Sequence, residues 1–296
     1  MARDIYGVIT ALLTPFTKDG NIDEESLREL IRFQIEHEVN AFFPCGTAGE
    51  GMLMPPELRK KVTEIVVDEV NGKVPVIVHV GTSDTETTVE LAKHAEDCGA
   101  DAVSAITPYY YKHDVKSLIL HYREISESVD IPVYVYNNPG RTGINVTPEV
   151  LGRLVDEANI KGIKDSSKDL IQFADYVLMF NDRINLIIGS DALFLPALVI
   201  GAKGLVSALS NVFPEVVVNV YKAIVNGNLE EARKAFFLML KIRNVLKEGP
   251  YLAAYKEALN LRGIKFEGFR KPLRPLNEKE RNLLRDKLKS LVPDLL

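Results

Sequence analysis

The chain has 296 residues, of which 46% are hydrophobic and 26% charged, a composition typical of a globular protein with a sizeable core. Its formal net charge is −5 and its acidic and basic residues are interspersed, so the sequence indicates no basic face for nucleic acid or an anionic membrane. The N-terminus has no apolar segment of signal-peptide length, and no later run approaches the length of a membrane span. We therefore expect a cytoplasmic protein with reduced thiols at Cys45 and Cys98.

Short apolar runs alternate with helical patterns along the first 225 residues. The first unit joins a strand that begins at Gly7 to a helix over residues 24–38. Further strands are predicted over residues 41–44, 74–80, 102–106, 131–136, 160–164, 184–188 and 204–208. Helices are predicted over residues 56–70, 84–98, 115–129, 148–157, 170–180, 192–200 and 214–225.

These eight units predict an α/β fold of the (β/α)8 TIM-barrel type. Strands that are apolar on both faces form a parallel sheet covered by helices, and eight such units can close into a barrel. After residue 225 the pattern changes to helices alone, over residues 229–246, 251–261 and 278–291. We therefore expect a barrel domain over residues 1–226 and a C-terminal helical extension over residues 227–296 that packs on the barrel.

Lys164 stands at the end of the sixth predicted strand. If Ile160, Gly162 and Lys164 share one face of that strand, the lysine amine is aimed into the interior. Burial disfavours an ammonium ion and lowers the lysine pKa, and a neutral amine is a nucleophile. The alternative is a solvated loop lysine paired with Asp165, as most charged residues lie on the surface.

Other polar residues follow the predicted strands, where barrel enzymes carry their reacting groups. The glycines around Thr47 allow backbone N–H groups to face an anion, although a plain turn needs glycine as well. Tyr136 could direct its hydroxyl inward or serve only the core. Arg141 could bind a carboxylate or be a solvated loop arginine.

The sequence offers no convincing metal or phosphate site. His79 ends the third predicted strand, but no second ligand stands at metal-binding spacing, which favours a core or loop histidine. Gly201 and Gly204 flank the eighth strand, where some barrels bind phosphate, yet no Lys or Arg follows at that loop. We therefore predict no metal.

Taken together and in this order, several motifs resemble those of the dihydrodipicolinate synthase / N-acetylneuraminate lyase family of pyruvate-dependent class I aldolases. The resemblance runs from about Tyr6 to Leu291. The motifs are Gly46-Thr47-Ala48-Gly49-Glu50, Thr107-Pro108-Tyr109-Tyr110, Tyr136-Asn137-x-Pro139-x-Arg141-Thr142-Gly143, Gly162-Ile163-Lys164 and Gly189-Ser190-Asp191.

The resemblance implies a role for each matching residue. Lys164 matches the Schiff-base lysine, Tyr136 the proton-transferring phenol, and Thr47 and Tyr110 its relay partners, with Tyr110 reaching across a subunit contact. The Thr47-Ala48 loop matches the pyruvate carboxylate site, and Val206 matches a residue whose backbone carbonyl faces the active site. The family chemistry needs no metal or organic cofactor. The resemblance also implies a homotetramer built as a dimer of dimers.

Departures from the family pattern bear on the substrate and on regulation. Ala48 stands where many relatives have Thr or Ser, so one hydrogen bond to the carboxylate is missing. Pro56 and Ser83 stand where lysine-inhibited synthases carry His and Asn, which argues against feedback by lysine. Ala192 replaces the acidic residue that sialic acid lyases carry after Asp191.

The sequence leaves two classes of aldehyde partner open. Arg141 favours aspartate semialdehyde, because the matching arginine holds its carboxylate. Ser166, Asp191 and Tyr111 favour a polyhydroxylated partner, and Gly189 lies in the same Gly-Ser-Asp turn.

We expect a lyase that joins pyruvate to an aldehyde or cleaves the product, first of the 2-keto-3-deoxygluconate type and alternatively a 4-hydroxy-tetrahydrodipicolinate synthase. A deoxy-sugar acid dehydratase that uses the same lysine stays open. A non-catalytic ligand-binding barrel is disfavoured, because a binding pocket needs no reactive amine beside a proton relay. A phosphate-sugar isomerase is disfavoured by the absence of a basic phosphate loop.

Overall fold

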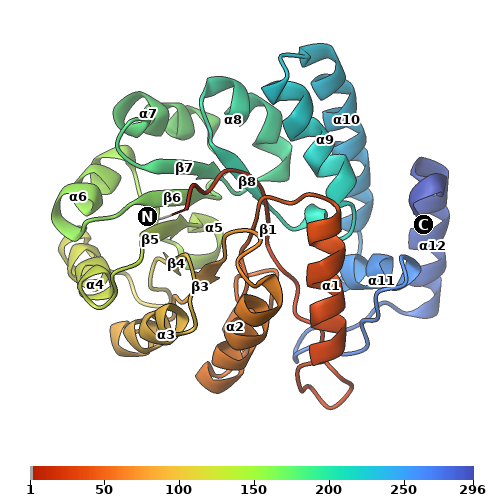
Figure 1. The fold of residues 1–296 in the computed structure, drawn as a ribbon, viewed down its shortest axis with the longest axis horizontal. Coiled ribbons are helices and arrows are strands. Elements are labelled where there is room, and N and C mark those ends of the chain that lie inside the picture. The colour runs from red at the N-terminus through yellow and green to blue at the C-terminus, as the bar shows by residue number, and fades with distance from the viewer. Residues whose placement is uncertain (1–2) are drawn as a thin grey trace.

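The computed structural model describes residues 3–296 and has eight parallel strands surrounded by helices (Figure 1). The strands are β1 (Gly7–Thr10), β2 (Ala41–Phe42), β3 (Ile77–His79), β4 (Ala102–Ile106), β5 (Val133–Asn137), β6 (Gly162–Asp165), β7 (Asn185–Ile188) and β8 (Gly204–Ser207). The helices are α1 (Glu24–Glu36), α2 (Pro56–Val70), α3 (Thr85–Asp97), α4 (Val115–Glu127), α5 (Pro139–Thr142), α6 (Pro148–Ala158), α7 (Leu170–Phe180), α8 (Phe194–Ile200), α9 (Pro214–Val225), α10 (Leu229–Leu246), α11 (Ala253–Leu261) and α12 (Glu278–Leu291).

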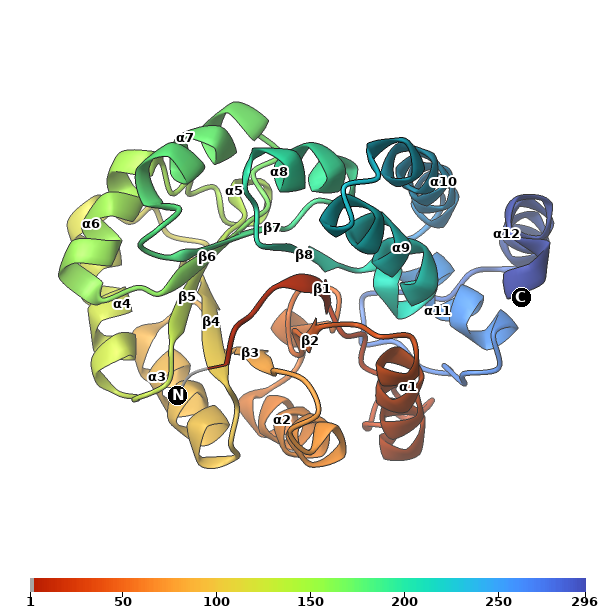
Figure 2. The ribbon, with the colours of Figure 1, turned by 45° about the horizontal axis from the view of Figure 1, so that its top comes forward.

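The strand order confirms the predicted (β/α)8 barrel. The sheet runs β2-β1-β8-β7-β6-β5-β4-β3 with every pair parallel, and an isolated parallel bridge between Phe42 and Val76 joins its two ends. In Figure 2 the strands lie in the centre and the helices around them. The carboxyl ends of all eight strands therefore meet on one side of the molecule, where barrel active sites lie.

Several predicted elements differ in their bounds, among them β2, β3 and β5. β2 ends at Phe42 rather than residue 44, because Pro44 has no N–H with which to continue the ladder. β3 is limited to Ile77–His79, and β5 runs two residues later at its start and one at its end than predicted. The turn at residues 139–143 is a one-turn helix, α5, with Pro139 in its first turn and Gly143 in the left-handed conformation after it.

The register of β5 and β6 brings Tyr136 and Lys164 side by side. In this parallel pair Tyr136 lies opposite Lys164, and Tyr134 lies opposite Gly162. The Tyr134 ring occupies the space above Gly162, where an added Cβ would lie 2.1 Å from the ring atom Cε1. Gly162 thus allows a tyrosine to fill the barrel one layer below Lys164.

We expect Gly162→Ala to lower the free energy of unfolding by about 1–3 kcal/mol, because the Tyr134 ring is buried and cannot move aside without strain. The matched control is Gly152→Ala in α6, where the added Cβ would lie 3.5 Å from the Phe180 ring, an ordinary contact. That change should stabilise the protein by about 0.5–1 kcal/mol. Urea denaturation of both variants measures the difference, and equal effects would contradict the packing argument.

The C-terminal residues form the predicted helices. In both ribbon views α10, α11 and α12 lie on one side of the barrel, beside α9 and α1 (Figures 1 and 2). α10 packs against α9, and α12 packs against α10 and α11. The division into domains at residue 226 stays a prediction.

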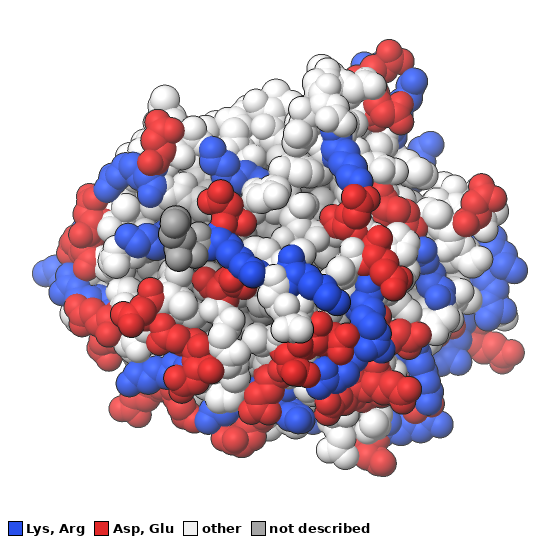
Figure 3. Space-filling view, in the orientation of Figure 1, with Lys and Arg blue, Asp and Glu red and all other residues white. Residues whose placement is uncertain are grey.

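The surface carries charges of both signs. On the face shown in Figure 3, Lys and Arg side chains are interspersed with Asp and Glu. Within residues 3–296 no helix is long and apolar enough to cross a membrane.

Candidate active site

The Lys164 side chain lies inside the barrel, where it is only 5% exposed. Its Nζ lies 3.9 Å from the centroid of the Phe43 ring and 3.9 Å from that of the Tyr136 ring. Burial lowers the pKa of the amine, and the nearby Tyr136 hydroxyl opposes that shift only in part. Lys164 is therefore more readily deprotonated than a surface lysine.

Asp165 is not the partner of Lys164. Because neighbouring residues of a strand face opposite sides, the Asp165 carboxylate points away from the amine. It accepts hydrogen bonds from Asn137 Nδ2 at 2.8 Å and from Ser167 Oγ at 2.7 Å. Burial raises the pKa of Asp165 to about 6. The pair predicted for a solvated lysine is thus absent, and Asp165 instead joins the ends of β5 and β6.

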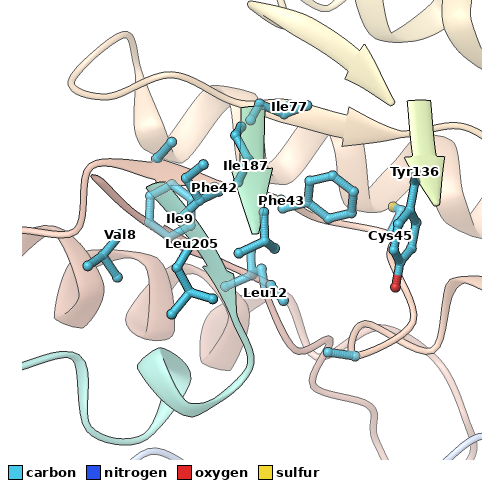
Figure 4. Packing of buried hydrophobic residues seen from close by; sticks show 14 of the residues in the cluster. Val8, Ile9, Leu12, Phe42, Phe43, Cys45, Ile77, Tyr136, Ile187 and Leu205 are labelled. Atoms are coloured by element: carbon cyan, nitrogen blue, oxygen red, sulfur yellow. The ribbon is translucent and has the colours of Figure 1, made fainter. Parts of the chain in front are cut away.

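The Tyr136 hydroxyl lies in a hydrogen-bonded group beside the amine. It lies 3.2 Å from Thr47 Oγ1 and accepts a hydrogen bond of 2.9 Å from Asn138 Nδ2. The ring meets Phe43 edge to face at 6.0 Å between centroids, where Phe43 lies between the aliphatic core and Tyr136 (Figure 4). Burial alone would raise the pKa of Tyr136, but the Lys164 charge and the hydrogen bonds outweigh it and lower the pKa. The hydroxyl can therefore give up and regain a proton next to the amine.

Thr47 and Ala48 lie in a tight loop that glycines make possible. An added Cβ at Gly51 would lie 1.8 Å from the Cys45 carbonyl oxygen, and one at Gly49 would lie 2.8 Å from that of Leu12. No acceptor among residues 3–296 takes the backbone N–H groups of Thr47 and Ala48. These two N–H groups are free to bind an anion at the cavity wall.

The cavity around Lys164 has a volume of about 400 Å³. Nine of the ten residues that the sequence predicts for the site line this cavity: Thr47, Ala48, Tyr136, Arg141, Lys164, Ser166, Gly189, Asp191 and Val206. They come from loops after β2, β5, β6 and β7 and from β5, β6 and β8 themselves. The barrel thus brings together residues that are up to 159 positions apart in the chain, from Thr47 to Val206.

Tyr110 is the exception. Its side chain is 87% exposed and its ring lies 5.1 Å from that of Tyr111, which is itself 68% exposed. Neither residue lines the cavity of its own chain, and Tyr110 has a left-handed backbone with φ of 81°. The relay role predicted for Tyr110 therefore requires a second copy of the chain.

The C-terminal helices supply cavity residues that the sequence analysis missed. They are Arg243 on α10, Lys247 directly after α10, and Tyr251, Leu252 and Tyr255 before and within α11; Lys168, after β6, was also missed. Arg141 stacks over the Tyr251 ring at 4.9 Å. The only sequence signal was the spacing of Arg243 and Lys247, which puts both on one helix face.

His79 has a structural environment. Arg59 donates a hydrogen bond of 2.6 Å to the His79 carbonyl oxygen, and the Ile106 N–H donates one of 3.3 Å to His79 Nε2. Burial and the charges of Arg59 and Lys164 hold the pKa of His79 well below its usual value. In the part of the chain that the structure describes, no three His, Cys, Asp or Glu side chains are grouped to hold a metal ion.

The chain matches the model of the dihydrodipicolinate synthetase family over residues 4–291. A DapA-like lyase of Halobacterium salinarum is 40% identical over 97% of this chain and 94% of the relative. A protein of Geobacter sulfurreducens named 4-hydroxy-tetrahydrodipicolinate synthase is 39% identical over 92% of this chain and 93% of its own length.

Solved structures agree with this match. Dihydrodipicolinate synthase from Thermotoga maritima is similar with a TM-score of 0.91 and 38% identity, over 97% of this chain and 98% of that one. YagE, a prophage protein of E. coli K12 of the dihydrodipicolinic acid synthase family, was solved in complex with pyruvate. It is similar with a TM-score of 0.94 and 31% identity, over 98% and 99% of the two chains.

Proposed function

The chain belongs to the dihydrodipicolinate synthetase family of class I aldolases and lyases, and from that membership we propose that Lys164 forms a Schiff base with pyruvate. The observation that carries the proposal is the buried Lys164 amine, held between two aromatic rings inside the cavity and beside the Tyr136 hydroxyl. A low-pKa amine next to a proton donor is a costly arrangement that a mere binding pocket does not need.

In the proposed reaction the neutral amine attacks the ketone carbon of pyruvate. Loss of water gives an iminium ion, which withdraws electrons so that the methyl carbon can lose a proton and become an enamine. The enamine then forms a carbon–carbon bond with an aldehyde, and cleavage is the reverse. Tyr136, hydrogen-bonded to Thr47, is placed to move protons at the carbinolamine and at the aldehyde oxygen.

Pyruvate is proposed to direct its carboxylate at the loop of Thr47 and Ala48. Both residues line the cavity, and their backbone N–H groups have no partner in the described chain. Because Ala48 carries no hydroxyl, these N–H groups and Thr47 Oγ1 must make the contacts with the carboxylate.

Borohydride reduction in the presence of pyruvate tests the proposal. Intact mass and peptide mapping should find a reduced pyruvate adduct on Lys164 that is absent without pyruvate. A folded protein that forms no adduct at saturating pyruvate would overturn the Schiff-base proposal.

For the aldehyde, the names of the relatives support aspartate semialdehyde more than the sugar-acid partner that the sequence analysis put first. Arg141 lines the cavity and can pair with its carboxylate. The hydroxylated aldehyde stays the second candidate because Ser166 and Asp191 also line the cavity, whereas Tyr111 does not. The rate of pyruvate consumption with each aldehyde, glyceraldehyde or aspartate semialdehyde, decides between them.

A homotetramer built as a dimer of dimers is part of the proposal. The exposure of Tyr110 and Tyr111 supports a covering partner there. An apolar groove of about 320 Å³ near Thr47 and Arg141, lined in part by Met52, Leu53 and Tyr109, also supports one.

We expect Tyr136→Phe to lower kcat by about 10²–10⁴-fold, the usual range for losing a proton-transfer group. The change should also shift the pH dependence of the rate of Schiff-base formation, moving its acidic limb to lower pH. The Tyr136 hydroxyl raises the pKa of Lys164, so its removal lets that pKa fall further. Rates of adduct formation measured against pH give this shift.

Tyr134→Phe is the matched control. Tyr134 lies two residues earlier on β5, and its hydroxyl accepts a hydrogen bond from Asn185 in the layer below the site. Tyr134→Phe should leave kcat within about threefold of the wild type, because a hydrogen bond remote from the reacting atoms contributes about 1 kcal/mol to stability and nothing to the reaction. Equal losses in the two variants would argue against proton transfer by Tyr136.

A further inference from the structure

A buried polar pair lies directly behind the proposed reacting groups, on the outer face of the barrel sheet. In the register of β5 and β6, Tyr136 lies opposite Lys164. The next rung pairs Asn137 with Asp165, and this second pair points toward the surrounding helices, because successive residues of a strand face opposite sides. Both side chains are 0% exposed, and Asn137 Nδ2 donates 2.8 Å to Asp165 Oδ1. One side-chain hydrogen bond therefore joins the two strands one residue beyond the phenol and the amine.

The other hydrogen bonds of Asn137 hold its side chain in one position. Its Nδ2 also donates 2.9 Å to Asn145 Oδ1, and its Oδ1 accepts 3.0 Å from the Val146 N–H. Asn145 Nδ2 in turn donates 2.7 Å to Gln172 Oε1 on α7. A buried polar network whose members all have partners is rigid. Because the loop before α6 fixes Asn137, the hydrogen bond to Asp165 fixes the end of β6 relative to β5.

Asp165 is a buried carboxylate that no cation in residues 3–296 neutralises. Its Oδ2 accepts 2.7 Å from Ser167 Oγ. The titratable groups that face it are Asp169, at the start of α7, and Tyr176 on that helix. Burial raises the pKa of Asp165 to about 6, so the group is ionised at neutral pH in spite of this surrounding. Buried charge of this kind is unfavourable for folding, and such groups are concentrated at functional sites.

We propose that the hydrogen bond between Asn137 and Asp165 positions the two reacting groups and holds the phenol beside the amine. The proposal rests on the proposed function, since it assigns the contact that keeps Tyr136 able to act on Lys164. A misplacement of about 1 Å can cost about 10²-fold in rate, and a slip between β5 and β6 would separate the two groups. The hydrogen bond lies about 3.3 Å further along the strands, where it opposes such a slip.

The pH dependence of adduct formation with pyruvate reports the position of the phenol. The Tyr136 hydroxyl raises the pKa of Lys164, so a phenol that moves away lets that pKa fall and moves the acidic limb to lower pH. His79 on β3 is another titratable group near the amine, but its pKa is held well below the usual value, and it is uncharged at neutral pH. The acidic limb therefore distinguishes a loss of position from a loss of stability alone.

The test compares Asp165→Ala, which removes the acceptor, with Asp165→Asn, which keeps one. The new Asn Oδ1 can accept from Asn137 while its Nδ2 donates to Ser167 Oγ. In Asp165→Ala we expect kcat to fall at least about tenfold and the acidic limb to move to lower pH. In Asp165→Asn we expect kcat within about threefold of the wild type and no shift of the limb.

Combination with Tyr136→Phe separates an effect through the phenol from a direct effect on the amine. Adding Asp165→Ala to Tyr136→Phe should shift the acidic limb no further, because the group whose position is lost is already absent. A further shift in the double variant would overturn the proposal, as would wild-type kinetics in a folded Asp165→Ala protein. Equal losses in Asp165→Ala and Asp165→Asn would also overturn it, because the charge rather than the hydrogen bond would then matter.

Asp101→Ala is the matched control. Asp101 precedes β4 and accepts 2.9 Å from the Val76 N–H, so it also joins two neighbouring strand segments, but at the amino ends of the strands. The change should lower the stability and leave kcat and the acidic limb unchanged. Thermal denaturation checks the folding of each variant. If Asp165→Ala does not fold, Asn137→Ala removes the same hydrogen bond from the other strand.

Borohydride trapping of pyruvate in the wild type separates this proposal from the proposed function. An adduct on Lys164, together with an unchanged pH profile in Asp165→Ala, refutes the positioning role alone. The absence of an adduct from the wild type refutes the Schiff-base chemistry on which the positioning role rests.

Discussion

Replacing Lys164 by Met is expected to lower pyruvate-dependent turnover at least about 10³-fold, because the change removes the buried amine that we propose forms the iminium ion. The same change should not lower the free energy of unfolding. The wild-type amine is buried against Phe43 and Tyr136 and has no carboxylate partner in the described part of the chain, whereas a methionine of similar length is well suited to that apolar contact. Steady-state kinetics and urea denaturation measure the two effects.

The difference in the free energy of unfolding between Lys164→Met and the wild type should depend on pH. The folded-state pKa of Lys164 lies below its ordinary value of 10.5, so the unfolded chain binds more protons than the folded one between the two values. The cost of burying the amine is therefore fully present below the lowered pKa and is lost as the pH rises towards 10.5. The stability difference between Lys164→Met and the wild type should shrink over that range.

Two results would contradict this account. Turnover close to that of the wild type in a folded Lys164→Met protein would show that another residue is the nucleophile. A large loss of stability at neutral pH would show that the amine is held by favourable contacts rather than desolvated.

Glu50→Gln is expected to lower the free energy of unfolding by about 3–5 kcal/mol, since it leaves a buried charge without its partner. The Lys256 side chain is 2% exposed, that of Glu50 is 0% exposed, and the two form an ion pair. Lys256 also donates 3.0 Å to the Gly268 carbonyl oxygen, and Glu50 accepts 2.8 Å from the Arg270 N–H. Burial lowers the pKa of Lys256, and the charge of Glu50 opposes this.

This ion pair connects the loop of Thr47 and Ala48 to the C-terminal extension. Glu50 ends the Gly-Thr-Ala-Gly-Glu motif, Lys256 lies on α11, and residues 268–270 follow α11. Breaking the pair should therefore weaken both the packing of the extension and the position of the carboxylate loop. We expect KM for pyruvate to rise in Glu50→Gln together with the loss of stability.

Urea denaturation tests the size of the effect against a matched exposed pair. Glu38 pairs with Lys222 at 2.5 Å, but the two side chains are 68% and 47% exposed, so Glu38→Gln should cost less than about 1 kcal/mol. The double variant Glu50→Gln with Lys256→Met should recover much of the loss, because the unpaired ammonium is then gone. A similar cost for Glu50→Gln and Glu38→Gln would show that the buried pair has no special role.

The sequence was sufficient to predict the barrel and the centre of its site. Alternation of apolar strands with helices has a period that can be counted, and barrel sites lie at the carboxyl ends of strands, so Lys164, Tyr136 and Thr47 could be assigned to one place. The alternation of side chains along a strand also placed Lys164 inside the barrel. These predictions combine local sequence patterns with one property of all (β/α)8 barrels, the location of the active site at the carboxyl ends of the strands.

Tertiary structure alone decided two other features. Within residues 3–296 Lys164 has no salt bridge to a carboxylate, and this depends on packing across β5 and β6, which brings Asn137 to Asp165. The position of Arg243 and Lys247 at the cavity depends on how α10 folds back over the barrel, about 80 residues after Lys164. A helix face shows only that residues lie together, because the surface it covers is set by long-range contacts.

The remaining difference concerns Tyr110, which the motif assigns to the relay and which lies exposed on the single chain. Strand periodicity and the order of the motifs were enough to predict the positions of Lys164, Tyr136 and the Thr47-Ala48 loop. Each position depends on residues near in sequence, or on the general finding that barrel active sites lie at the carboxyl ends of the strands. Long-range packing decided the position of Arg243 and Lys247 at the cavity and the Glu50–Lys256 ion pair, because both join segments whose contact no local pattern encodes.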